Sequence, residues 1–309
     1  MWRKLKYTGP ERRKARRWRP RPVSFLVACL ALIVVFYSAA VVWLMVQETQ
    51  LVFQAGATLP AGRPSFPYDQ IDLPRADGAR QFAWVMRRGS LDDGPWVLFL
   101  HGNAATIASK VNISHYRQLL ELGLNVLAPE YRGFAGLDGD PTEAVLAADA
   151  RAAYDYLRST RKVPATRIVI YGWSLGAAVA VSLASSVEEG AVILEGAPAS
   201  LVAIGQRRYP FFPIRLIMQN PFEAIKTIDR ISSPILFLHS PDDAVIPIAE
   251  GRRLFDAARA PKTFVELRGG HVYASEVDAE HFFGSIAPFL KKSGLLEATR
   301  TAVPARPGS

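Results

Sequence analysis

The chain begins with one long apolar run and continues as an alternation of short apolar runs with longer, more polar segments. Residues 23–46 carry no charge, and a polar stretch follows at 47–67. Short runs rich in β-branched and aromatic residues then predict strands at 68–73, 80–87, 96–100, 125–128, 167–171, 191–194, 234–239 and 263–267. The intervening segments predict helices at 105–122, 141–159, 248–258 and 278–291. This alternation predicts an α/β domain with a mostly parallel central sheet and helices on both faces.

One segment breaks the alternation. Residues 199–229 combine aromatic residues and prolines with a mostly apolar stretch, and we expect them to form a short lid inserted after a strand. The predicted organisation is therefore a basic tail, a membrane anchor, a linker, an α/β domain and a disordered tail, at 1–22, 23–46, 47–67, 68–293 and 294–309 respectively.

Positive charge is concentrated at the N-terminus. The net charge is +9, and residues 1–22 hold ten lysines or arginines against one acidic residue, so the rest of the chain is formally neutral. A neutral globular part has no electrostatic footprint for nucleic acid. Basic residues before an apolar span keep that end in the cytoplasm, which predicts export of the rest of the chain.

The apolar run at 23–46 has 24 residues, enough to cross a bilayer as a helix with some tilt. A cleaved signal peptide is the main alternative, but its apolar core is usually shorter and is followed by a polar mature start. Residues 26–29 also resemble a lipoprotein signal box, although cleavage before Cys29 would leave most of the span attached. We therefore expect a single-pass signal anchor. Cys29 is the only cysteine, so the exported domain has no disulfide.

The strand predicted at 167–171 leads into Gly-Trp-Ser-Leu-Gly at 172–176, and a helix of small residues follows. This strand–turn–helix context is typical of a nucleophile elbow, in which a strained turn presents a serine hydroxyl at the top of a sheet. The helix N-terminus offers unpaired N–H groups and a positive dipole end to a developing oxyanion. Ser174 is therefore the candidate nucleophile.

Other candidates follow the carboxyl ends of neighbouring strands, where ligands bind in open parallel sheets. Residues 101–104 form a small-residue loop whose N–H groups can approach a substrate carbonyl. Asp242 and Asp243 follow the seventh predicted strand, and His271 follows the last one in a glycine-rich turn. The imidazole of such a triad takes the serine proton, and the carboxylate orients the ring. Serine, carboxylate and histidine also occur in the expected chain order.

Together these motifs resemble the α/β-hydrolase superfamily and, more narrowly, the Bem46-like serine hydrolases, several of which have an N-terminal membrane anchor. The resemblance covers about residues 50–292. Five motifs carry it: His-Gly-Asn-Ala at 101–104, Tyr-Arg-Gly at 131–133, Gly-Trp-Ser-Leu-Gly at 172–176, Asp-Ala-Val-Ile-Pro at 243–247 and Gly-Gly-His at 269–271. The resemblance implies an α/β-hydrolase fold with a short lid, preceded by one transmembrane helix.

The resemblance also implies residue roles. The family pattern places the acid two residues before the Val-x-Pro segment, which favours Asp243 over Asp242. It makes Ser174 the nucleophile and His271 the base. The oxyanion-hole donors become two backbone N–H groups, those of Asn103 and Leu175.

The chain departs from the family pattern at two places. Glu130 stands where an aspartate is usual, and Ser240-Pro241 replaces the usual Gly-x, which puts the position of the acid loop in doubt. We expect the remaining histidines to be structural or solvated, with the first of them bracing the oxyanion loop: His101, His115, His239 and His281.

Four aromatic residues are candidates to line an acyl pocket, although ordinary packing explains them equally well: Trp173, Tyr209, Phe211 and Phe212. No cluster of cysteines, histidines and carboxylates has metal-ligand spacing, and no glycine-rich phosphate loop occurs. The sequence therefore predicts no metal or organic cofactor.

The sequence predicts a membrane-anchored serine hydrolase that cleaves an ester, thioester or amide through an acyl-enzyme. The membrane anchor and the apolar lid favour a small-molecule, lipid or acylated substrate. The expected location is a bacterial inner membrane, with the catalytic domain facing the periplasm. The alternatives are a non-catalytic binding module and a small-peptide exopeptidase. The complete triad argues against the first, and the lack of an acidic cluster for a peptide amine disfavours the second. The oligomeric state is left open.

Overall fold

The computed structural model describes residues 22–56, 59–75, 77–89 and 94–297. The predicted basic tail up to residue 21 and the end of the predicted C-terminal tail, 298–309, lie outside these ranges. The described chain divides into two units, one ending at Leu44 and the other beginning at Met45.

Helix α1 spans Pro22–Phe53 and is the one helix in the described part of the chain that is long and apolar enough to cross a membrane. In the first unit its apolar side chains are exposed, for example Val34 at 63% and Phe36 at 72%. The helix continues past the predicted end of the anchor at residue 46 and ends at Phe53. The glutamines and the glutamate at 47–50 are good helix formers, so polarity alone does not end the helix.

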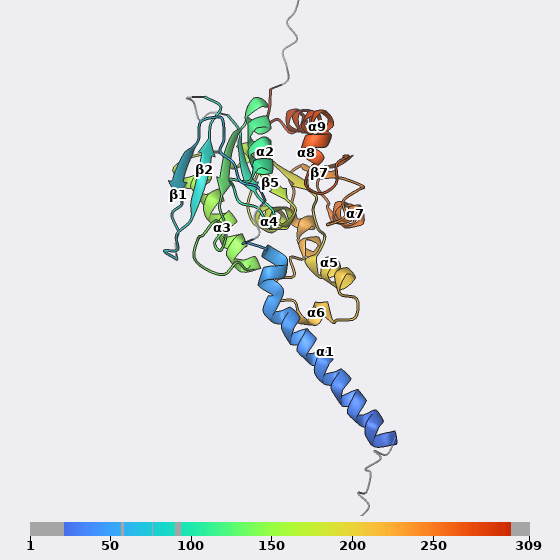
Figure 1. The fold of residues 1–309 in the computed structure, drawn as a ribbon. Helices are drawn as coiled ribbons and strands as arrows, with labels where there is room; N and C mark the ends of the chain where they lie inside the picture. Colours follow the sequence, from blue (N-terminus) through green and yellow to red (C-terminus); the bar gives the residue numbers. More distant parts are fainter. Residues whose placement is uncertain (1–21, 57–58, 76, 90–93, 298–309) are drawn as a thin grey trace, which may run out of the picture. The chain divides into compact units, whose positions relative to one another are not determined.

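Eight strands form one sheet in the order β1-β2-β4-β3-β5-β6-β7-β8. Strands β3 to β8 run parallel, and β2 is antiparallel to both of its neighbours. This confirms the predicted mostly parallel sheet (Figure 1). The strands are β1 Asp69–Asp72, β2 Phe82–Met86, β3 Trp96–Leu100, β4 Asn125–Pro129, β5 Ile168–Trp173, β6 Ala191–Glu195, β7 Ile235–His239 and β8 Lys262–Glu266.

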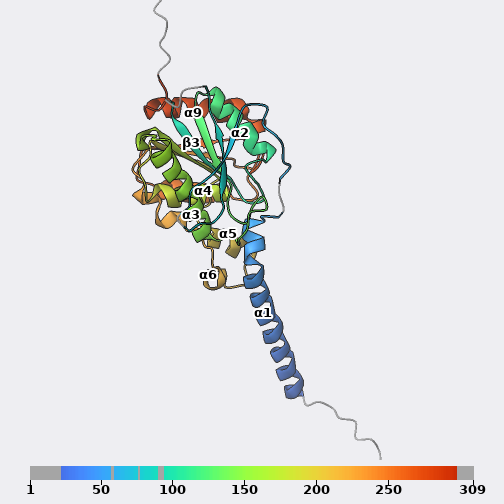
Figure 2. The same cartoon turned by 90° about the vertical axis from the view of Figure 1, so that its left-hand side faces the viewer.

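Helices cover both faces of the sheet. Helices α2 and α9 pack on one face and α3 and α4 on the other (Figure 2). Helix α3 continues as one π-helical turn at Tyr156–Thr160, and single 3₁₀ turns lie at Ala165–Arg167, Ala224–Lys226 and Ile228–Arg230. The helices of the second unit are α2 Lys110–Glu121, α3 Glu143–Asp155, α4 Leu175–Ala184, α5 Leu201–Arg208, α6 Ile214–Ile217, α7 Ile248–Ala257, α8 Ala274–Val277 and α9 Ala279–Lys292.

The structure differs from two predicted boundaries, the start of one helix and the start of the C-terminal tail. Helix α2 begins at Lys110 and not at residue 105, because Ser109 Oγ accepts the N–H of Thr106 at 3.0 Å and holds the preceding residues in a turn. The predicted disordered tail from residue 294 is also wrong for its first residues. Leu295 is only 4% exposed and belongs to the same buried cluster as Phe289.

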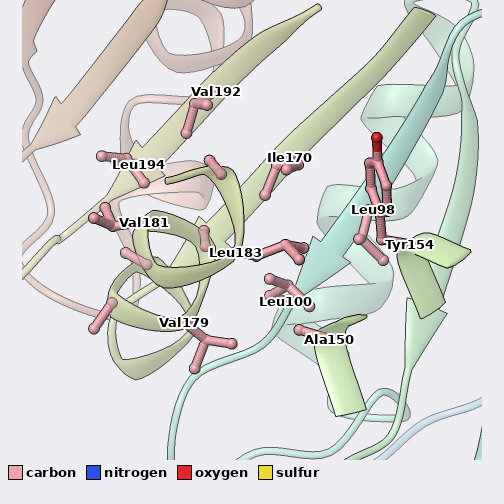
Figure 3. Close-up of a cluster of buried hydrophobic side chains, with 14 of the residues drawn as sticks. Leu98, Leu100, Ala150, Tyr154, Ile170, Val179, Val181, Leu183, Val192 and Leu194 are labelled. Carbon is pink, nitrogen blue, oxygen red and sulfur yellow. The ribbon is translucent and has the colours of Figure 1, made fainter. Parts of the chain in front are cut away.

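Helix α4 is buried on nearly all sides and belongs to the hydrophobic core on one face of the sheet. Figure 3 shows Val179, Val181 and Leu183 of α4 in a cluster that includes Leu100 of β3 and Ile170 of β5. Each such side chain stabilises the fold by about 1.5–3 kcal/mol relative to an exposed one. Small residues elsewhere in α4 let the helix backbone lie close to the sheet.

The segment between β6 and β7 contains α5 and α6, within the predicted lid at 199–229. The end of α1 in the second unit contacts residues 219–222 of this segment. The Glu48 carboxylate accepts the N–H groups of Gln219 and Asn220 at 2.7–2.9 Å and the Asn220 side-chain amide at 3.0 Å. The rings of Phe53 and Phe222 meet edge to face, with centroids 6.0 Å apart. Two residues of the predicted linker, Glu48 and Phe53, are therefore buried in the second unit.

Replacing Glu48 with alanine should lower stability, because three donors would lose a charged acceptor in a buried position. We expect the free energy of unfolding to fall by about 2 kcal/mol. The melting temperature of the full chain in detergent, followed by intrinsic fluorescence, checks this. Gln50→Ala is the control, because Gln50 is exposed on the same helix. Equal melting temperatures for the two variants would contradict the contact.

Gly176→Ala should destabilise the fold, because its Cβ would overlap the backbone oxygens of Leu100 and His101. We expect a loss of about 3 kcal/mol in the free energy of unfolding. The control is Gly284→Ala in α9, where a Cβ meets nothing within 4 Å. That variant should gain about 0.5–1 kcal/mol from helix propensity. Chemical denaturation measures both, and a Gly176→Ala protein as stable as the parent would show that the turn has room to relax.

Candidate active site

The turn between β5 and α4 holds Ser174 in a strained conformation. Its φ is +56° and its ψ is −120°, a region that costs a non-glycine residue of the order of 1–3 kcal/mol. The Ser174 N–H donates to the carbonyl of Glu195 at 2.8 Å, and the Ser174 carbonyl accepts the N–H of Ala177 at 2.9 Å. Strand β6 and the first turn of α4 therefore hold the serine in this conformation.

Three side chains form a continuous line of hydrogen bonds. Ser174 Oγ lies 2.7 Å from His271 Nε2, and His271 Nδ1 lies 2.6 Å from Asp243 Oδ2. Since the carboxylate accepts the proton on Nδ1, Nε2 is left to accept the serine hydroxyl. The Asp243 side chain is 1% exposed and that of His271 is 8% exposed. This arrangement can withdraw a proton from Ser174 and compensate the charge that forms on the ring.

The acid loop after β7 selects one of the two candidate carboxylates. Asp243 Oδ1 accepts the N–H groups of Val245 and Ile246 at 2.9 and 2.7 Å, which turns the other oxygen toward His271. Asp242 is exposed. His239 Nε2 donates to the Ile246 carbonyl at 2.8 Å, and burial lowers the pKa of this histidine. His239 is thus a neutral structural donor that fixes the acid loop.

The loop after β8 presents His271. Gly269 and Gly270 have φ values of +108° and +69°, which residues with a Cβ rarely adopt. The indole N–H of Trp173 donates to the His271 carbonyl at 3.3 Å, and the Gly270 N–H donates to Ser240 Oγ at 3.1 Å. Ser240, one of the departures from the family pattern, therefore ties the histidine loop to the acid loop.

The loop after β3 lies against the serine. A Cβ on Gly102 would be 3.1 Å from the Cβ of Ser174, so the backbone passes close to the candidate nucleophile. The Asn103 side chain donates to the carbonyl of Val52 at 3.1 Å, and the Ala104 N–H donates to that of Phe53 at 3.2 Å. The carbonyls at the end of α1 thus hold the loop that presents the Asn103 backbone.

Glu130 also has a defined place. One of its carboxylate oxygens lies 2.9 Å from His101 Nε2 and accepts the Tyr131 N–H at 3.2 Å, and the other accepts the Ile107 N–H at 3.1 Å. His101 Nδ1 lies 2.8 Å from the Gly102 carbonyl. The glutamate is therefore buried with three partners, and His101 braces the loop as expected.

A buried polar network behind the elbow was not foreseen from the sequence. One oxygen of Glu195 lies 3.0 Å from His115 Nε2 and accepts the Tyr171 hydroxyl at 2.6 Å. Burial lowers the pKa of His115, but the adjacent Glu195 carboxylate outweighs it, so the pKa is raised. Burial also raises the pKa of Tyr171 well above its ordinary value. Glu195 ends β6, and a carboxylate at the end of an apolar strand was the available signal.

The four candidate pocket aromatics lie in different environments. Trp173 is 2% exposed and its indole N–H is bonded to the histidine loop, whereas Phe211 is 85% exposed. Tyr209 and Phe212 are half-buried. A buried indole and an exposed phenyl ring do not line one enclosed pocket, so the acyl pocket stays a prediction. Within the described ranges, no group of three or more histidines, cysteines and carboxylates is arranged to hold a metal ion.

Comparisons with known proteins agree with this architecture. The sequence profile of the alpha/beta hydrolase family matches residues 97–224, which include the elbow and the loop after β3. An uncharacterized protein of Mycobacterium tuberculosis is 32% identical over 290 residues, covering 91% of this chain and 98% of that protein. The lysophosphatidylserine lipase ABHD12 of Danio rerio is 30% identical over 188 residues, 55% of this chain and 48% of that protein.

A solved structure shows the same fold. The esterase Pf2001 of Pyrococcus furiosus superimposes with a TM-score of 0.65, covering 77% of this chain and 97% of that structure, at 20% sequence identity. The mycobacterial relative matches almost from end to end, and the family profile covers the centre of the sheet. The chain therefore belongs to the alpha/beta hydrolase family and has the α/β-hydrolase fold.

Proposed function

We propose that the protein is a membrane-anchored serine hydrolase that cleaves an ester, thioester or amide bond through an acyl-enzyme intermediate. The observation that carries this proposal is the line of hydrogen bonds from Ser174 through His271 to Asp243, at 2.7 and 2.6 Å. These distances are those at which a base can take the proton of a nucleophile without rearrangement.

In the proposed reaction, Ser174 Oγ attacks the substrate carbonyl carbon while His271 Nε2 takes the hydroxyl proton. The tetrahedral intermediate collapses as the same proton passes from His271 to the leaving alkoxide, thiolate or amine. A water molecule then loses a proton to His271 and attacks the acyl carbon. The second intermediate releases the carboxylic acid and returns the proton to Ser174. Asp243 stays ionised throughout and stabilises the charged imidazolium.

The negative charge on the carbonyl oxygen needs donors that are in place before the reaction. Leu175 is the first residue of α4, where the helix leaves backbone N–H groups unpaired. The backbone of Asn103 follows Gly102, which lies against Ser174. We assign the oxyanion hole to the N–H groups of these two residues. A preorganised donor of this kind typically lowers the barrier by about 3 kcal/mol.

The substrate is proposed to be an acylated amphiphile or another small ester. The anchor at 23–46 would hold the domain at a membrane, and the zebrafish relative is named as a lipase that acts on a lysophospholipid. The basic tail before the anchor supports a location of the proposed catalytic domain outside the cytoplasm, and we favour the periplasm of a bacterium. We propose no metal or organic cofactor, because the triad supplies nucleophile, base and acid.

The triad assignment predicts the kinetics of p-nitrophenyl ester hydrolysis by the full chain in detergent. Ser174→Ala and Asp243→Asn should each lower kcat by a factor of about 10⁴ or more, because each removes part of the proton-transfer system. Asp242→Asn should leave kcat unchanged, since that carboxylate points to solvent. A large loss in Asp242→Asn with an active Asp243→Asn variant would mean that the acid is assigned to the wrong residue.

The contact between Asn103 and α1 predicts a second kinetic effect. Asn103→Ala keeps the backbone N–H but loses the bond to the Val52 carbonyl, so the donor should be less well placed. We expect kcat to fall by up to about tenfold with little change in KM, since the oxyanion forms only in the transition state. Gln50→Ala is the control on the same helix. A rise in KM at constant kcat would instead assign the Asn103 side chain to substrate binding.

A further inference from the structure

The part of the predicted lid at 201–222, which we call the lid segment, exposes two large apolar side chains. Phe211 is 85% exposed and Leu216 is 84% exposed, which makes them the two most exposed large apolar side chains of the described residues. They flank the buried Ile214, so that the loop after α5 and the short helix α6 together present apolar side chains to the outside. Two large apolar side chains that are exposed this fully only five residues apart are candidates for contact with a partner or a membrane.

Three arginines lie near these two side chains in the sequence. Arg207 and Arg208 close α5, and Arg215 lies within α6, and all three are exposed. The sequence has no acidic residue between Glu195 and Glu223, so the segment carries a net charge of +3. Arginine forms bidentate hydrogen bonds with phosphate groups. Exposed apolar side chains among arginines match the chemistry of an anionic phospholipid surface, where headgroups lie above acyl chains.

Within the second unit, the residues that follow the apolar run contact this segment. The apolar run ends at Val46, and Glu48 binds the backbone of Gln219 and Asn220 at the end of the lid segment. Two helical residues span about 3 Å. This part of the lid segment is therefore bound to the chain two residues after the apolar run ends.

We propose that the lid segment 201–222 docks on the anionic surface of the membrane that holds the anchor. Phe211 and Leu216 enter the boundary between headgroups and acyl chains, and the three arginines bind lipid phosphates. The proposal rests on the membrane anchoring in the proposed function. It makes the lid, which begins six residues after Glu195, the part of the domain that an amphiphilic substrate meets first on leaving the bilayer.

Lipid contact of a single labelled position tests the docking. Leu216→Cys in a Cys29→Ala full chain is labelled with an environment-sensitive fluorophore and reconstituted into vesicles of phosphatidylcholine and phosphatidylglycerol. Val277→Cys, an exposed apolar position on α8, is the matched control. We expect lipids with a nitroxide on the acyl chain to quench the label at 216 severalfold more than the label at 277. The combined change of Arg207, Arg208 and Arg215 to glutamate should remove most of this difference.

The outcomes separate this proposal from the anchoring on which it rests. If the chain floats with the vesicles but the labels at 216 and 277 are quenched equally, the docking is wrong and the anchor stands. If the chain does not float, both are wrong. Quenching at 216 that is the same in pure phosphatidylcholine vesicles, or in the triple glutamate variant, would overturn the assignment to anionic lipid. None of these readings depends on hydrolysis, so they do not change with the outcome for the triad.

Discussion

The close packing of the β5–α4 turn against β3 is the constraint on which the rest of the site depends. Gly176 has no room for a side chain beside the carbonyls of Leu100 and His101, and the Glu195 carbonyl holds the N–H of Ser174. The turn can keep its strained serine because α4 is buried on the sheet and cannot move away. The other residues of the candidate site lie on loops, and each loop must bring its residues close to Ser174.

Three loops lie against the Ser174 turn, and a few specific hydrogen bonds hold each of them. The acid loop is fixed by two backbone N–H groups on Asp243, and the histidine loop by Trp173 and Ser240. The third loop, at 101–104, is held by the carbonyls that end α1. The same helix end binds the lid through Glu48. In the α/β-hydrolase fold of this chain, the residues that follow the proposed anchor are therefore part of the support of the site.

The sheet and the order of the site residues could be predicted from the sequence, because buried parallel strands appear as continuous apolar runs and ligand-binding residues follow their carboxyl ends. Contacts between distant side chains could not. Glu48 and Asn220 are 172 residues apart, and His115 and Glu195 are 80 residues apart. No local sequence pattern indicates that two such distant residues will form a hydrogen bond. Helix boundaries failed where a side chain overrode the pattern, as Ser109 does before α2. The triad roles, the acyl pocket and the exported location stay predictions.

The most direct test of the central claim is covalent labelling of the full chain with a fluorophosphonate, followed by mass spectrometry of its peptides. The account predicts one adduct, on Ser174, that forms in the folded protein and is lost in His271→Ala, because only an activated serine attacks phosphorus at neutral pH. A folded chain that gives no adduct, or an adduct on another serine, would contradict the serine-hydrolase mechanism. The absence of any adduct would favour the alternative of a non-catalytic binding module with the α/β-hydrolase fold.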